Sequence, residues 1–103
     1  MERTFIAIVV QNIDNTQRNQ IQETIKKYAT SWWHEFLDLW ILETDETMIA
    51  WRERLEVIFS PGGSQLLIIN VADTAPRWCG FILPYDQSQW LRENIRGSRR
   101  LLP

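Results

Sequence analysis

The chain has 103 residues, of which 45% are apolar and 23% are charged, and its formal net charge is −2. This composition is typical of one globular domain, and no apolar run approaches the roughly 20 residues of a membrane span. The basic surplus that usually marks nucleic-acid-binding domains is absent overall. We therefore expect a cytoplasmic protein without a membrane segment, and Cys79, the only cysteine, excludes an intrachain disulfide.

The first two elements are a strand and a helix. Residues 4–10 predict a strand that is covered on both faces or lies centrally in a sheet, because they are almost continuously apolar. A helix is expected from about Thr16 to Ala29, with Asn15 or Thr16 as its cap. Its apolar stripe consists of Ile21, Ile25 and Tyr28.

The tryptophan-rich stretch from 31 to 44 holds three of the six tryptophans and the only histidine. It predicts a β-hairpin with strands at 32–36 and 39–43, and one longer strand with a bulge is the alternative. Trp32 and Trp33 are adjacent, so their side chains face opposite ways on a strand. We expect one of them in the core and the other exposed, where a tryptophan is a favoured interface anchor.

The second half begins with a helix whose start signals are Thr44 to Thr47. Its expected core stripe consists of Met48, Trp51, Leu55, Ile58 and Phe59. A second covered strand is expected at 65–71, and a further strand at 78–83. A last short helix, capped by Ser88, is expected to turn Trp90, Leu91 and Ile95 to its apolar side.

The order of these elements predicts an α+β protein with a ferredoxin-like βαββαβ fold. Two helices would cover one face of a mainly antiparallel sheet, and a C-terminal strand and short helix would be added to it. We expect residues 1–96 to form a single domain and residues 97–103 a flexible basic tail.

Several segments together resemble the small SinR-like proteins of the Cas2-like superfamily. They are Trp32-Trp33-His34 followed by Trp40-Ile41, the strand at 66–71, and Trp78-Cys79-Gly80-Phe81. The resemblance covers residues 4–95. It implies a ferredoxin-like homodimer joined through sheet faces and C-terminal segments, with a possible link to prokaryotic defence.

Cas2 proteins hold DNA beside an integrase partner, and some are described as metal-dependent nucleases with an aspartate at the end of the first strand. Here Val10 or Gln11 stands at that place, and neither offers a carboxylate. The nearest acid, Asp14, follows in the turn. The resemblance therefore implies a protein without a resident cofactor, unless Asp14 supports a nuclease that uses Mg²⁺ or Mn²⁺.

The candidate site is an interface and not a catalytic centre. His34 has no second metal ligand at a usual spacing, so we expect a structural histidine and no metal site. The candidate interface or binding residues are Gln11, Trp32, Trp33, His34, Arg96, Arg99 and Arg100.

These observations favour a non-catalytic homodimer that binds a macromolecular partner, either protein or nucleic acid. Two alternatives remain open. One is the metal-dependent endonuclease based on Asp14. The other is a sensor that binds a nucleotide or another small ligand in the cleft between two subunits, which rests on analogy between folds.

Overall fold

The computed structural model of the chain describes residues 4–59, 63–71 and 84–95. The chain divides into two compact units, Met1–Asn70 and Val71–Pro103. The described elements of the first unit are β1 (Thr4–Gln11), α1 (Asn15–Tyr28), β2 (Ser31–Phe36), β3 (Leu39–Thr44), α2 (Met48–Glu56) and β4 (Gln65–Asn70). The second unit contains α3 (Tyr85–Asn94).

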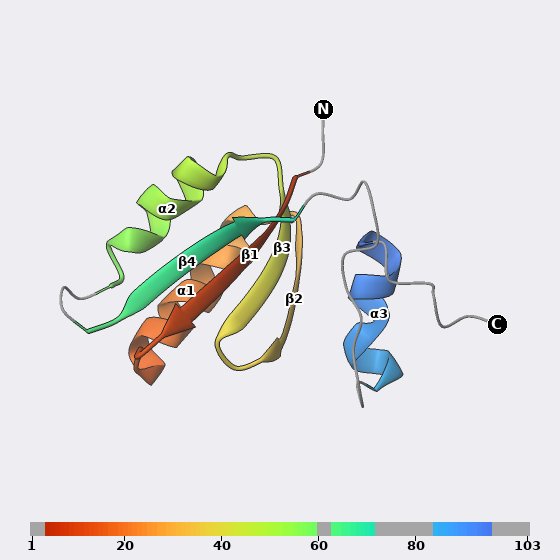
Figure 1. Cartoon of the computed structure of the whole chain (residues 1–103), viewed down its shortest axis with the longest axis horizontal. Coiled ribbons are helices and arrows are strands. Elements are labelled where there is room, and N and C mark those ends of the chain that lie inside the picture. Colours follow the sequence, from red (N-terminus) through yellow and green to blue (C-terminus); the bar gives the residue numbers. More distant parts are fainter. Residues whose placement is uncertain (1–3, 60–62, 72–83, 96–103) are drawn as a thin grey trace. The chain divides into compact units, whose positions relative to one another are not determined.

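The four strands form one sheet in the order β2-β3-β1-β4, and all neighbouring strands are antiparallel (Figure 1). The N-terminal strand β1 is therefore central, and its residue Ile8 stands opposite Trp40 on one side and Ile68 on the other. The predicted α+β class and antiparallel sheet are confirmed. The strand order is compatible with a small ferredoxin-like fold.

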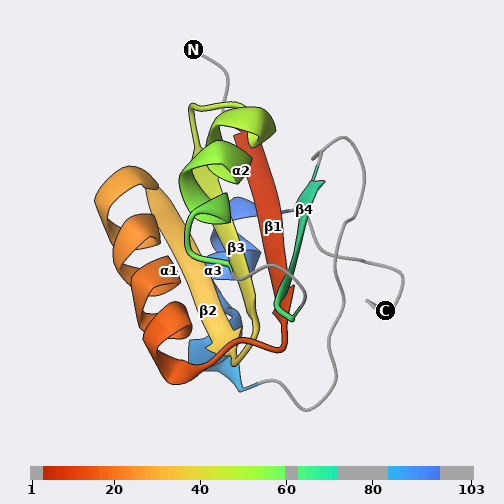
Figure 2. The ribbon, with the colours of Figure 1, turned by 90° about the vertical axis from the view of Figure 1, so that its left-hand side faces the viewer.

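The core of the first unit lies between the sheet and two helices, α1 and α2, which cover the same face (Figure 2). Because side chains alternate along a strand, every second residue of β1 points toward these helices. The buried core cluster consists of Ile6, Ile8, Val10, Ile21, Ile25, Trp40, Leu42, Trp51 and Leu55.

Helix α1 is capped one residue earlier than the sequence analysis expected. Asp14 is the N-cap: its carboxylate accepts the Gln17 backbone N–H at 2.8 Å, and the Gln17 side chain accepts the Asp14 backbone N–H at 2.9 Å. This reciprocal pair satisfies two backbone donors that the helix leaves without partners. The turn before it uses Asn12 at a φ of 61°, a left-handed conformation that asparagine tolerates better than most residues.

Two of the predicted helical stripe members are not in the core. Met48, at the first position of α2, is exposed, because the stripe of this short helix begins only at Trp51. Tyr28, at the last position of α1, is also exposed. The ring of Tyr28 instead lies against the guanidinium group of Arg54 from α2.

The prediction that the strand at 65–71 is covered is wrong for the described residues. Strand β4 stands at an end of the sheet, and Leu67 and Ile69 are exposed. An apolar sequence alone does not distinguish a central strand from an edge strand, whereas the pairing order does.

In the second unit, α3 begins at Tyr85 after an N-cap at Pro84. Ser88, the predicted cap, lies inside the helix, and its hydroxyl donates to the Tyr85 carbonyl at 3.2 Å. Leu91 is buried, as predicted. The predicted strand at 78–83 and the predicted tail at 97–103 lie outside the described residues.

Candidate functional site

The two adjacent tryptophans of β2 face opposite sides of the sheet, as expected from their positions. Trp32 stands opposite Leu42 and packs, half-buried, against the core cluster. Trp33 stands opposite Ile41 and is only 4% exposed; the edge of its ring meets Phe36 with centroids 5.1 Å apart. The predicted exposure of one of the two is not observed, because Trp32 is half-buried and Trp33 is buried, and their role as interface anchors stays a prediction.

His34 has the structural role that the sequence analysis predicted. Its ring stacks on Trp40 at 4.2 Å between centroids, and its Nε2 lies 3.1 Å from the Leu37 carbonyl at the hairpin turn. The Trp40 indole in turn donates to the Gln22 side chain of α1 at 2.7 Å. The histidine thus fixes the hairpin against a buried tryptophan.

The end of β1, where Cas2-like nucleases have an aspartate, offers no carboxylate of its own. Val10 is buried and Gln11 is exposed. Asp14 is exposed, but its carboxylate caps α1. The nuclease alternative would therefore have to use a side chain that already stabilises a helix start.

A second carboxylate reaches this place from the hairpin turn. The Val10 backbone N–H donates to the Asp38 carbonyl at 3.1 Å, which sets Asp38 beside the end of β1. Its side chain accepts bonds from Arg18 Nε and Nη2 at 3.1 and 2.9 Å, and Arg18 Nη1 donates to Asn15 at 2.7 Å. Asp38 was missed from the sequence, because its place depends on the pairing of β3 with β1, in which Leu39 stands opposite Val9.

The cluster of Asp38, Arg18 and Asn15 is better explained as a structural link between two elements than as a metal centre. The charge of Asp38 is paired with that of Arg18, and hard cations prefer several free oxygen ligands. Among the described residues, no group of three or more histidine, cysteine, aspartate or glutamate side chains is arranged to hold a metal ion. The network joins the start of α1 to the β2–β3 turn.

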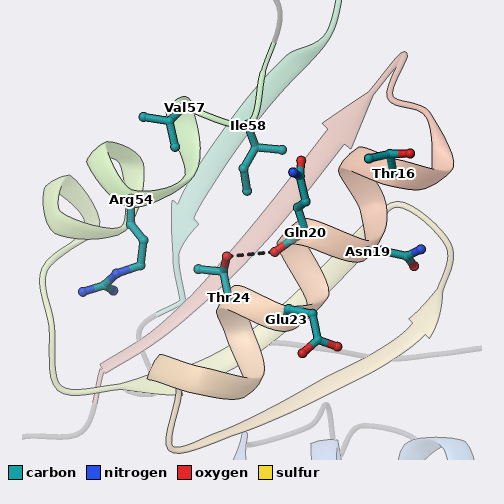
Figure 3. Close-up of a pocket in the computed structure, with 8 residues that line it drawn as sticks. All are labelled: Thr16, Asn19, Gln20, Glu23, Thr24, Arg54, Val57 and Ile58. Carbon is teal, nitrogen blue, oxygen red and sulfur yellow. Dashed lines mark hydrogen bonds between the residues drawn. The ribbon is translucent and has the colours of Figure 1, made fainter.

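A shallow groove of about 490 Å³ lies between α1 and α2 (Figure 3). Its wall on α1 is polar, and its wall on α2 ends in two apolar residues. The lining residues are Thr16, Asn19, Gln20, Glu23, Thr24, Arg54, Val57 and Ile58. The Thr24 hydroxyl donates to the Gln20 carbonyl at 2.8 Å, so it is satisfied within its own helix.

Arg54, the cation of this groove, is held by two neighbours. It donates to both carboxylate oxygens of Glu46, and the Tyr28 ring centroid lies 3.8 Å from its guanidinium carbon. The hydrogen bonds from Arg54 lower the pKa of the Glu46 carboxyl, and the same bonds raise the pKa of Arg54. The guanidinium is thus engaged before any ligand arrives.

The remaining predicted binding residues, Arg96, Arg99 and Arg100, lie outside the described residues. In the part of the chain that is described, no helix is long and apolar enough to cross a membrane. Gln11 is the last residue of β1 and Asp14 is the N-cap of α1, and the structure places the tryptophans of the hairpin on two faces of the sheet.

No family model and no curated protein matches this chain. Among solved structures, the chain is similar to a hypothetical protein, TT1823, from Thermus thermophilus. The TM-score is 0.57 at 21% sequence identity, and the match covers 78% of this chain and 94% of that chain. At this identity the likeness concerns the fold alone.

Proposed function

We propose that this chain is a non-catalytic, Cas2-like homodimer with a ferredoxin-like fold that binds a macromolecular partner, with a link to prokaryotic defence. The main support for the proposal is that the carboxylates near the end of β1 are already engaged by other groups of the protein. Val10 and Gln11 supply none, Asp14 caps α1, and Asp38 is paired with Arg18. A metal-dependent nuclease needs free carboxylate ligands at that place.

Two further features support the proposed fold. The strand order β2-β3-β1-β4 is compatible with a ferredoxin-like sheet, and both helices of the first unit cover one face. The formal net charge of −2 favours a protein partner over a nucleic acid, because it gives no overall attraction to phosphates.

The test combines size and activity measurements on the full chain. We expect multi-angle light scattering to give twice the chain mass. We also expect no cleavage of single- or double-stranded RNA or DNA with Mg²⁺ or Mn²⁺ above a metal-free control. A monomer would refute the homodimer.

The activity assay needs a variant that separates catalysis from folding. Asp14→Asn keeps a side-chain oxygen that caps a helix but removes the negative charge. Metal-dependent cleavage that disappears in Asp14→Asn, at an unchanged melting temperature, would establish the nuclease alternative in place of the binding protein.

A further inference from the structure

Strand β4 lies at an edge of the described sheet, and its own sequence lacks the residues that often protect such an edge. Among the described residues, β4 pairs only with β1, so its other side presents backbone groups without a strand partner. The strand Gln65–Asn70 contains no charged residue and no proline. Edge strands of monomeric proteins are commonly blunted by such residues, and an unprotected apolar edge is a template for another strand.

Apolar side chains surround this edge on both faces of the sheet. A groove of about 210 Å³ runs between α2 and β4 and is lined by Met48, Ile49, Arg52, Leu66, Leu67 and Ile68. Ile49, on the helix-covered side, is 64% exposed, and Leu67, on the opposite face of the sheet, is 56% exposed. The exposed apolar surface therefore wraps around the edge and does not lie on one face alone.

This surface is complementary to itself. In β4 four aliphatic residues lie between Gln65 and Asn70. Residues opposite each other in an antiparallel pair share a face of the sheet, so a two-fold pairing centred on Leu67 sets Leu66 against Ile68 and Gln65 against Ile69 of the second copy. Helix α2 contributes both signs of charge, because Arg52 and Glu56 lie 3.9 Å apart on its exposed side. Two antiparallel copies of α2 would bring unlike charges together.

We propose that the β4 edge and the adjoining α2 groove form the interface between two copies of this chain, in which β4 pairs with β4 of the second copy. A two-fold axis beside β4 would continue the sheet from one copy into the other, as an isologous contact requires. This inference rests on the homodimer of the proposed function and specifies its surface.

The test compares three single lysine variants of the full chain by analytical ultracentrifugation. Leu67→Lys and Ile49→Lys place a charge on opposite faces of the sheet at the same edge. Leu37→Lys, at the hairpin tip, is the control, because Leu37 is similarly exposed at 65% but distant from β4 in the pairing order. We expect the first two to raise the dimer dissociation constant by roughly 100-fold, the cost of a lysine left unpaired in an interface, and the control to leave it unchanged.

The other outcomes separate the two proposals. If the wild type is a dimer and only one of Leu67→Lys and Ile49→Lys weakens it, or neither, the interface lies elsewhere and this inference is wrong, while the homodimer stands. The same holds if Leu37→Lys weakens the dimer equally. A monomeric wild type refutes both proposals.

A mixing experiment supplies a positive signal. Leu67→Lys and Leu67→Glu are each expected to be monomers, because like charges meet near the two-fold axis. An equimolar mixture is expected to form a heterodimer, since the lysine of one copy then lies within reach of the glutamate of the other. If the mixture stays monomeric while both variants keep the wild-type circular dichroism, β4 does not pair with itself.

Where a lysine variant does not fold, glutamine at the same position is used, and a dissociation constant within twofold of the wild type would exclude this edge.

Discussion

At the scale of single residues, several buried polar groups have partners that are distant in sequence. The Trp51 indole donates to the Thr44 hydroxyl at 2.9 Å, and Thr44 is almost fully buried. The Trp40 indole finds Gln22 on α1. The sequence predicted that Trp51 is a core residue, but it contains no signal that selects Thr44 or Gln22 as partners, because these contacts depend on how helices and strands pack.

The pair of Glu46 and Arg54 makes part of the stability of the fold dependent on pH. Arg54 lowers the pKa of Glu46 in the folded state. Such a carboxylate stabilises the fold fully above its unfolded pKa of about 4.3, and this contribution is lost as the pH falls through the lower, folded pKa. We expect Glu46→Gln to reduce the free energy of unfolding at pH 7 and to flatten its decline below about pH 4.3.

Urea denaturation at a series of pH values and a fixed protein concentration measures this effect. Glu23→Gln is the control, because Glu23 pairs with Lys26 only at 3.7 Å on the exposed surface of α1. The control should change the free energy of unfolding by no more than about 0.5 kcal/mol. If the free energy of unfolding declines equally below about pH 4.3 in the wild type and in Glu46→Gln, the assigned role of Arg54 is wrong.

At the scale of elements, Asp14 decides where α1 starts. Removing the cap in Asp14→Ala should cost about 1 kcal/mol, whereas Asp14→Ser, which keeps an oxygen in position, should cost only a few tenths. Thermal and chemical unfolding of both variants measure the difference. Equal losses would show that the reciprocal bonds with Gln17 contribute little.

Most elements could be predicted from the sequence because their patterns are local. The strand β1, both helices of the first unit and the hairpin follow from apolar periodicity and from capping residues. The edge position of β4, the burial of Trp33 and the place of Asp38 could not be predicted in this way. Each depends on which strand lies beside which, and neighbours in the sheet are far apart in the sequence.

The candidate site was harder to predict than the fold for the same reason. The resemblance to Cas2-like proteins directed attention to the end of β1, where Val10 and Gln11 offer no carboxylate. It gave no warning that the hairpin turn would bring Asp38, held by Arg18, to that end. The predicted interface role of Trp32 and Trp33 rested on strand alternation alone, which fixes the face of a side chain but not its exposure.

At the scale of the whole first unit, stability should depend on the helix-covered face of the sheet. Leu55 is completely buried in the core cluster, whereas Leu37 is 65% exposed at the hairpin tip. We expect Leu55→Ala to lower the free energy of unfolding by about 2–5 kcal/mol. Leu37→Ala, the matched control, should lower it by less than about 0.5 kcal/mol.

Equilibrium unfolding in guanidinium chloride, followed by tryptophan fluorescence, measures both variants. Two-state analysis applies if fluorescence and circular dichroism give the same transition. Comparable losses in the two variants would mean that the hairpin tip is packed in solution and that the core extends beyond the cluster between sheet and helices.

The central place of the N-terminal strand also affects how the chain folds as it is synthesised. Both neighbours of β1 come later, β3 at Leu39–Thr44 and β4 at Gln65–Asn70. At roughly 5–20 residues per second, a ribosome needs several seconds to deliver the second neighbour after β1 has emerged. During that time the aliphatic segment from Ile6 to Val10 has no complete set of strand partners. We therefore expect this segment of the nascent chain to benefit most from binding to a chaperone.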